Sequence, residues 1–205
     1  MRDPRLDEDD DHDHETPEPK REEEGVGPRS TLIETRTLLL GQSIDGEGFR
    51  RLVESVTLLE SVDATKPINV LINTYGGRET HAFAFHDFIR VARAPIRCIA
   101  SGVAGGVANL VLCAVPKERR FATPNTEFFL HQPASGSMGA TSDLQVAAAE
   151  LLAIRKRVLE VLALACGQSV ERLERDTRRK LTLDAEQAVA YGLVSRLIRS
   201  REDLG

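Results

Sequence analysis

The chain has 205 residues, of which 41% are hydrophobic, 29% are charged and only 4% are aromatic, with no tryptophan. This composition is typical of one globular domain, and the scarcity of aromatic rings together with a net charge of −5 argues against a nucleic-acid-binding surface. The charge is uneven: residues 1–28 hold 12 acidic and 4 basic residues, a net charge of −8, which leaves about +3 for the other 177.

The acidic segment 1–28 lacks the apolar residues that a core requires, and we expect it to be a disordered tail. Its cluster Asp11–Glu15 contains two histidines, but a solvated charge run is the simpler interpretation than a weak metal site. We therefore expect no metal and no cofactor. The segment also lacks the apolar centre of a signal peptide, and the chain has no run of 18 apolar residues, so we expect a cytoplasmic protein without a membrane partner.

From residue 29 to residue 198 the pattern changes to an alternation of apolar runs and amphipathic stretches. It predicts strands at 37–40, 68–72, 96–100, 120–122, 127–130 and 193–198, and helices at 46–61, 79–93, 102–115, 142–165, 169–178 and 184–190. This order predicts one α/β domain of repeated βαβ units around a mainly parallel sheet, followed by a short C-terminal tail at 199–205.

The three cysteines, Cys98, Cys113 and Cys166, are far apart in the sequence and odd in number, and no CxxC pair is present. A structural zinc site or a disulfide framework is therefore not expected. Each cysteine stands in an apolar stretch, which favours a small buried side chain.

Three segments could carry chemistry. The turn Tyr75-Gly76-Gly77 follows a strand and could present backbone N–H groups, as half of an oxyanion hole does. Ser101–Ala108 follows the next strand and has the small residues of a nucleophile elbow. His131 stands alone at the end of another strand, where a structural role would be the simplest interpretation of an isolated histidine.

Taken together and in order, these segments resemble the Clp-type proteolytic subunit, a self-compartmentalising serine peptidase. The resemblance covers about residues 31–198 and rests on Ile72–Gly77, Gly102–Ala108, Leu130–Pro133, Gly167–Gln168, Asp176–Lys180 and Glu186–Val194. It implies a ClpP/crotonase-like fold with a protruding strand-helix handle, here residues 134–141 and 142–165. It also implies heptameric rings stacked face to face, which are formed by this chain alone or with an active paralogue. It further implies a Clp ATPase as partner and polypeptides as substrates.

The chain departs from the family's catalytic motif at two of its three positions. The resemblance places Gly106 where the family has the nucleophilic serine, His131 at the retained histidine, and Lys180 where the family has the aspartate. It also assigns the oxyanion-hole N–H groups to Gly77 and Val107. A glycine has no hydroxyl to acylate, and an ammonium has the wrong sign to stabilise an imidazolium. We therefore expect a non-catalytic subunit, although the family consists of ATP-dependent endopeptidases.

Two alternatives from other classes remain open at this stage. The chain could be an active peptidase that uses unrecognised residues, although Ser101 lies five residues before the elbow and Asp176 matches a different aspartate of the family motif. It could also be a crotonase-like acyl-binding enzyme, for which the sequence offers no acidic catalytic residue or acyl-thioester pocket.

Assembly and partner binding follow from the resemblance as well. Arg179 matches an arginine that pairs across the two rings, so retained assembly is expected. The family's docking pockets for the ATPase use aromatic residues at the positions that Asn69 and Leu71 occupy here. A polar asparagine weakens an apolar pocket, so we expect weak ATPase binding. The acidic tail, which an inactive chain could not remove itself, is a candidate gate or docking arm.

Overall fold

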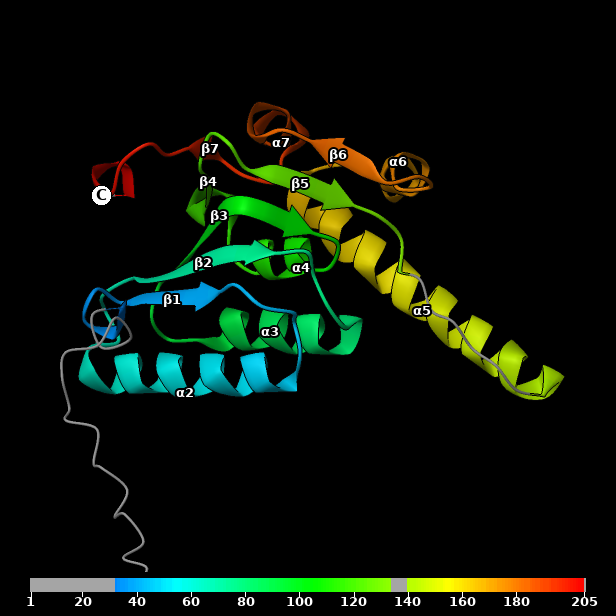
Figure 1. Ribbon diagram of the computed structural model, residues 1–205, viewed down its shortest axis with the longest axis horizontal. Helices are drawn as coiled ribbons and strands as arrows, with labels where there is room; N and C mark the ends of the chain where they lie inside the picture. The colour runs from blue at the N-terminus through cyan, green and yellow to red at the C-terminus, as the bar shows by residue number, and fades with distance from the viewer. Residues whose placement is uncertain (1–31, 134–139, 205) are drawn as a thin grey trace, which may run out of the picture.

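The computed structural model describes residues 32–133 and 140–204, so the acidic tail and most of the glycine-rich stretch at 134–141 lie outside the described residues. The described chain forms one twisted sheet with helices packed beneath it and one long helix that projects away from the body (Figure 1). None of the described helices is both long and apolar enough to cross a membrane.

The sheet is parallel apart from one strand. Its order is β1-β2-β3-β4-β7, with β5 pairing the second half of β3 and β6 pairing β5 in the antiparallel direction. The strands are β1 (Thr37–Leu40), β2 (Ile68–Thr74), β3 (Ile96–Gly105), β4 (Arg120–Ala122), β5 (Glu127–Leu130), β6 (Leu181–Leu183) and β7 (Arg196–Leu197). The predicted α/β architecture with a mainly parallel sheet is confirmed.

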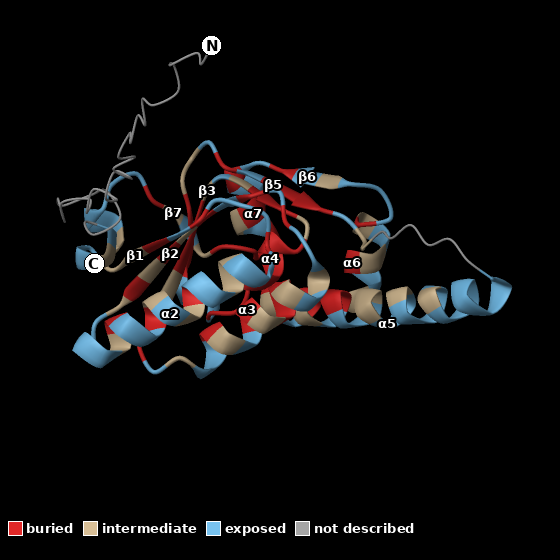
Figure 2. Ribbon diagram, turned by 60° about the horizontal axis from the view of Figure 1, so that its bottom comes forward, coloured by how far each residue is buried: buried red, intermediate tan, exposed pale blue. Residues whose placement is uncertain are grey.

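The helices cover one face of the sheet. They are α2 (Gly46–Val62), α3 (Glu79–Val91), α4 (Ala108–Leu112), α5 (Thr141–Cys166), α6 (Val170–Asp176) and α7 (Ala185–Tyr191), with 3₁₀ turns at Lys117–Arg119 and Glu202–Leu204. Helices α2 and α3 lie side by side below β1 and β2 (Figure 1). Figure 2 shows burial concentrated in the strands, in α4 and in the helix faces turned towards them.

Two predicted elements were wrong in their bounds. The predicted helix at 102–115 begins only at Ala108, because β3 continues to Gly105 and pairs with β5 from Val103 to Gly105. A run of small residues fits a strand or a helix equally well, and pairing with β5 decides between them. The predicted last strand at 193–198 is shortened to Arg196–Leu197.

Strand β6 was not predicted at all. It has three residues, Leu181-Thr182-Leu183, which is too short for an alternating pattern to be recognised. Its pairing with β5 nevertheless matters for the site, because it joins the segment after α6 to the strand that ends at His131.

The long helix α5 is buried over only half of its length. Its C-terminal half contributes Val158, Leu159 and Leu162 to the core. In the projecting N-terminal half, Val146 and Leu152 have 59% and 60% of their surface exposed. Figure 2 shows this half as mostly pale blue. The helix therefore presents apolar side chains for which the described single chain has no partner.

The three cysteines, which are separated in the sequence, are all buried. Cys113 and Cys166 belong to the same buried core cluster, and the Cys98 thiol donates to the Val111 carbonyl over 3.7 Å. Burial raises the pKa of Cys98 to about 12. The expectation of small buried thiols is confirmed, and their contacts tie β3, α4 and the end of α5 together.

Arg36 joins β1 to the C-terminal end of α2. Its guanidinium donates to four carbonyl oxygens, those of Leu59, Asp63, Lys66 and Pro67, over 2.9 to 3.1 Å. Its backbone has a φ of +51°, a conformation that costs energy for a residue with a side chain. A cation at a helix C-terminus is favourable because the last carbonyls carry partial negative charge. These bonds therefore offset the strain and fix where β1 enters the sheet.

We expect Arg36→Ala to lower the free energy of unfolding by about 2–4 kcal/mol, because several half-buried carbonyls lose a charged donor. Arg36→Lys keeps the charge but not the fork of donors and should lose about half as much. Urea unfolding followed by circular dichroism at one protein concentration measures both, with the exposed Arg90→Ala as control. Equal stability of Arg36→Ala and Arg90→Ala would contradict this role.

Candidate functional site

The site lies where β3, β5 and the turn after β2 meet. Gly106 stands between β3 and α4, has a φ of +50° and donates its N–H to the Phe129 carbonyl over 2.8 Å. A Cβ atom placed on Gly106 would lie 2.8 Å from Nε2 of His131. A side chain at residue 106 would therefore point directly at the histidine, as a nucleophile at an elbow points at its base.

His131 follows β5 and is exposed to solvent. Its Nδ1 lies 3.1 Å from the Gln132 carbonyl oxygen. A carbonyl only accepts, so Nδ1 carries the hydrogen in this bond and Nε2 of a neutral imidazole is left as an acceptor facing Gly106. The histidine is oriented as a base, but a backbone carbonyl holds it where a catalytic triad has a carboxylate.

Lys180 is brought to the same place by the pairing of β5 with β6. Leu130 pairs with Leu181, and continuing this register by one residue sets Lys180 opposite His131. The Lys180 ammonium lies 3.6 Å from the centre of the Phe129 ring, a cation–π contact. Within residues 32–133 and 140–204 it forms no ion pair with a carboxylate. The Tyr75 ring stacks on Phe129 from the neighbouring turn, with centroids 6.1 Å apart.

The turn Tyr75–Gly77 approaches the elbow so closely that side chains are excluded. A Cβ on Gly76 would lie 2.8 Å from the Gly105 carbonyl oxygen and 3.5 Å from the Val107 nitrogen. On its other side the turn pairs with Ile44 in a parallel bridge. The Ile44 N–H donates to the Gly76 carbonyl, and the Arg78 N–H donates to the Ile44 carbonyl. The N–H of Gly77 therefore points away from Ile44. Within the described chain, neither this N–H nor that of Val107 has a hydrogen-bond acceptor.

Asn109 is a site residue that the sequence analysis missed. It is fully buried in α4, and its Nδ2 lies 3.0–3.2 Å from the carbonyls of Ala104, Gly106 and Phe129. Its Oδ1 has no partner among the described residues. The sequence signal for Asn109 was that it is a single polar residue within an apolar run. Its side-chain amide holds the elbow against β5.

The other hydroxyl and carboxyl groups considered from the sequence are engaged elsewhere. The Ser101 hydroxyl accepts from Thr123 Oγ1 over 3.2 Å. Asp176 accepts from the Tyr191 hydroxyl and pairs with Arg172. Arg179 is exposed and forms no ion pair in the described parts of the chain. The same parts contain no cluster of His, Cys, Asp and Glu that could hold a metal.

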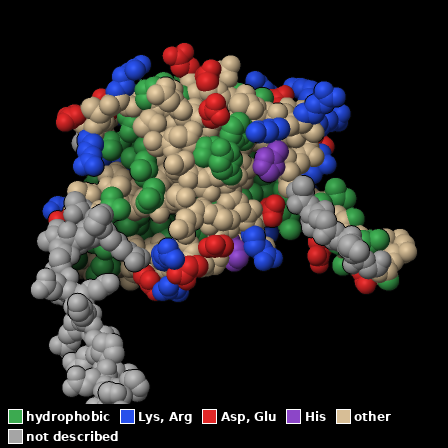
Figure 3. Space-filling view, viewed as in Figure 1, with side chains coloured by type: hydrophobic (Ala, Val, Ile, Leu, Met, Phe, Trp, Pro, Cys, Tyr) green, Lys and Arg blue, Asp and Glu red, His purple; other side chains and the backbone are tan. Residues whose placement is uncertain are grey.

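The face shown in Figure 3 has an exposed histidine with hydrophobic side chains and a basic side chain beside it.

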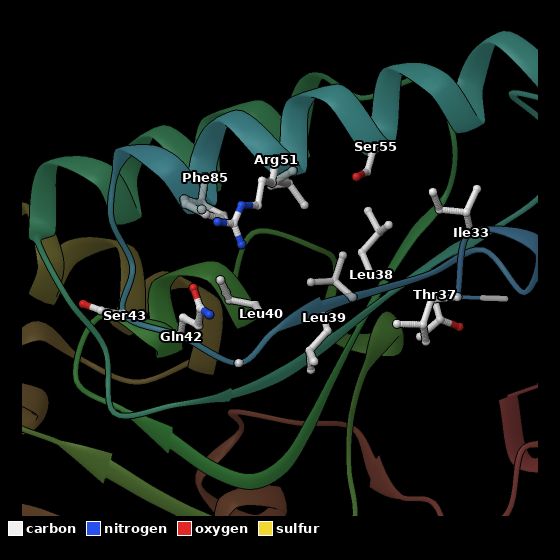
Figure 4. A pocket seen from close by; sticks show the side chains of 15 residues that line it. Ile33, Thr37, Leu38, Leu39, Leu40, Gln42, Ser43, Arg51, Ser55 and Phe85 are labelled. Carbon is white, nitrogen blue, oxygen red and sulfur yellow. The ribbon is translucent and has the colours of Figure 1, made fainter. Parts of the chain in front are cut away.

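Two hollows lie elsewhere, and neither is lined by His131 or Gly106. One, of about 440 Å³, lies between β1 and α2 and is mostly apolar (Figure 4). The other, of about 500 Å³, is lined by both Asn69 and Leu71 on the far side of the sheet. The Oδ1 of Asn69 is buried without a partner among the described residues.

Comparison with known proteins gives one consistent result. The family model described as Clp protease matches residues 20–201. The chain is 35% identical to the ATP-dependent Clp protease proteolytic subunit 2 of Treponema denticola, over 84% of this chain and 86% of the relative. It is 34% identical to the subunit of the same name from Chlamydia trachomatis, over 89% and 92% of the two chains.

A solved structure agrees with these relatives. ClpP1 of Listeria monocytogenes, solved as a point mutant, superposes with a TM-score of 0.80 at 31% sequence identity, covering 86% of this chain and 98% of that one. The chain thus combines this sheet order, a projecting helix and an elbow that faces a histidine with a sequence that matches the family over most of its length. The protein belongs to the Clp protease family.

Proposed function

We propose that this chain is a non-catalytic, ClpP-type subunit of a Clp protease complex, which assembles in rings with an active paralogue or with copies of itself. The observation that carries the proposal is the space in front of His131. A Cβ atom on residue 106 would lie 2.8 Å from Nε2 of His131. Residue 106 is a glycine, however, and has no side chain to carry a nucleophile.

Without a hydroxyl at residue 106, no acyl-enzyme can form there. In subtilisin, loss of the nucleophile alone lowers kcat by about 10⁶. Ser101 does not replace the nucleophile, because its hydroxyl accepts a hydrogen bond from Thr123 on the side of β3 that faces β4. His131 is therefore a base without a nucleophile to activate.

Lys180 removes the second triad function. An aspartate in a triad holds the histidine tautomer and stabilises the imidazolium, and its loss costs about 10⁴ in kcat. Here the Gln132 carbonyl holds the His131 tautomer instead. The Lys180 ammonium, which lies over the Phe129 ring, repels the positive charge that a His131 imidazolium would carry. The two substitutions therefore disable the same step independently.

Two features that the family resemblance implies do not need the triad. The N–H groups of Gly77 and Val107 stay unbonded within the described chain, so the site could hold a peptide carbonyl without cleaving it. The projecting half of α5 exposes Leu144, Val146 and Leu152, which suits a contact between rings to which Arg179 would add. We infer a subunit that shapes the chamber and its partner contacts.

We expect the chain to show no peptidase activity, and Gly106→Ser with Lys180→Asp to restore it, because the double variant supplies both the nucleophile and the carboxylate. Gly106→Ser alone should be about 10⁴-fold slower than the double variant. Hydrolysis of a fluorogenic peptide by the purified assembly measures both.

The control is Gly106→Ser with Lys180→Asp and His131→Ala, which should be inactive again. A native chain that already hydrolyses the peptide, with a rate unaffected by His131→Ala, would show an active peptidase using other residues. Binding of acyl-coenzyme A without peptide binding would instead favour the crotonase-like alternative.

Binding of a Clp ATPase should be weak, because Asn69 places a buried, unpartnered oxygen in the hollow that matches the family's docking pocket. We expect Asn69→Leu to raise affinity for a Clp ATPase by about tenfold, which corresponds to about 1.4 kcal/mol. Interferometry with immobilised rings measures it. Tight docking of the unaltered ring, unimproved by Asn69→Leu, would contradict this reasoning.

A further inference from the structure

One face of the sheet is not covered by helices. Residues of β1 to β3 alternate, so that Leu38, Val70 and Cys98 are buried under the helices. Thr37, Asn69 and Arg97 face the other way. Here the segment after β7 folds back over the sheet and forms a hollow of about 500 Å³. We call it the arginine groove; its lining includes Thr37, Asn69, Leu71, Arg97, Arg199 and Arg201.

The folded C-terminal segment gives the groove a defined wall. The Asp203 carboxylate accepts the backbone N–H groups of Arg199 and Ser200 over 2.6 and 2.9 Å. Leu204 packs against a small cluster of Ile99, Phe121 and Ile198. The backbone of the predicted C-terminal tail is thus anchored from residue 199 to residue 204, which places Arg199 and Arg201 at the rim.

The groove is basic. Its charged lining residues are Arg97, Arg199 and Arg201, and none of the lining residues is acidic. Glu202 and Asp203 of the adjoining C-terminal turn carry the opposite charge and offset part of the positive charge, and the Asp203 carboxylate is bonded to the backbone N–H groups of Arg199 and Ser200. A ligand for this groove should therefore be anionic and extended, and long enough to run along apolar side chains between the arginines.

The same chain carries such a ligand. Residues 7–24 hold eleven acidic residues and two basic ones. The described chain begins at Leu32, and Thr35 and Thr37 already line the groove. An extended chain spans at most about 3.3–3.6 Å per residue, so Glu24, eight residues before Leu32, can be up to about 28 Å away. The acidic residues can therefore reach the groove without any rearrangement of the fold.

We propose that the acidic segment 7–24 binds in the arginine groove of its own chain and covers it. The groove includes Asn69 and Leu71, at the positions of the family's docking pocket, so the segment would compete with any partner that binds there. Such electrostatic contacts between exposed groups are screened at high salt, where the Debye length falls to about 3 Å. Removal of the segment's charge or addition of salt should therefore uncover the groove.

Zero-length cross-linking tests this binding in the full-length protein. Arg201→Lys keeps the charge and introduces an amine that a carbodiimide can couple to a carboxylate in direct contact. We expect mass spectrometry to find cross-links from residue 201 to Asp or Glu residues of 7–24. Their yield should fall at least fivefold in 1 M NaCl, and equally when Asp7, Glu8, Asp9, Asp10 and Asp11 are replaced by their amides.

The matched control is Arg119→Lys, an exposed arginine outside the groove, which should give no such cross-link above background. A mixture of ¹⁵N-labelled and unlabelled chains separates the same chain from a neighbour. Equal cross-linking at residues 119 and 201, cross-links of residue 201 only to Glu202 or Asp203, or cross-links mainly between differently labelled chains would each overturn the proposal.

Discussion

The site depends on the close approach of two backbone turns. The turn after β2 and the end of β3 touch without side chains between them, since a Cβ on Gly76 would meet the Gly105 carbonyl at 2.8 Å and one on Gly105 would meet Tyr75 at 2.6 Å. Gly106, which follows Gly105 in this contact, faces His131. Asn109 holds the elbow from beneath through three backbone carbonyls.

Gly106 differs from these glycines in what surrounds it. A side chain at 76, 77 or 105 would collide with backbone, which cannot move without breaking the sheet. The atoms nearest to a Cβ at 106 would belong to the exposed His131 ring, which can turn aside, so a side chain there would meet backbone strain from the φ of +50° but no backbone collision among these nearest atoms. The packing of the fold therefore requires glycine at the first three positions but leaves room at the fourth. The proposed loss of the nucleophile would therefore be a chemical difference on an intact scaffold, and the exposed apolar side chains on α5 suit the proposed assembly.

Much of this arrangement could be predicted from the sequence because it depends on local pattern and on order. The alternation of apolar strands and amphipathic helices predicted the sheet, and the resemblance to the Clp family placed Gly106 at the nucleophile position and His131 at the histidine position. The contact between Lys180 and Phe129 could not be predicted, because it depends on the register of a three-residue strand, β6. The extent of β3 was missed for a similar reason: pairing with β5, not propensity, extends it to Gly105.

The central claim is that this chain cannot form an acyl-enzyme or any equivalent covalent adduct at Gly106. Intact-mass measurement after treating the assembled complex with a fluorophosphonate probe tests it most directly, because the probe marks activated hydroxyls. The account predicts that the mass of this chain stays unchanged, while a catalytic paralogue in the same complex gains one adduct per chain. A stoichiometric adduct on this chain that disappears with His131→Ala would contradict it.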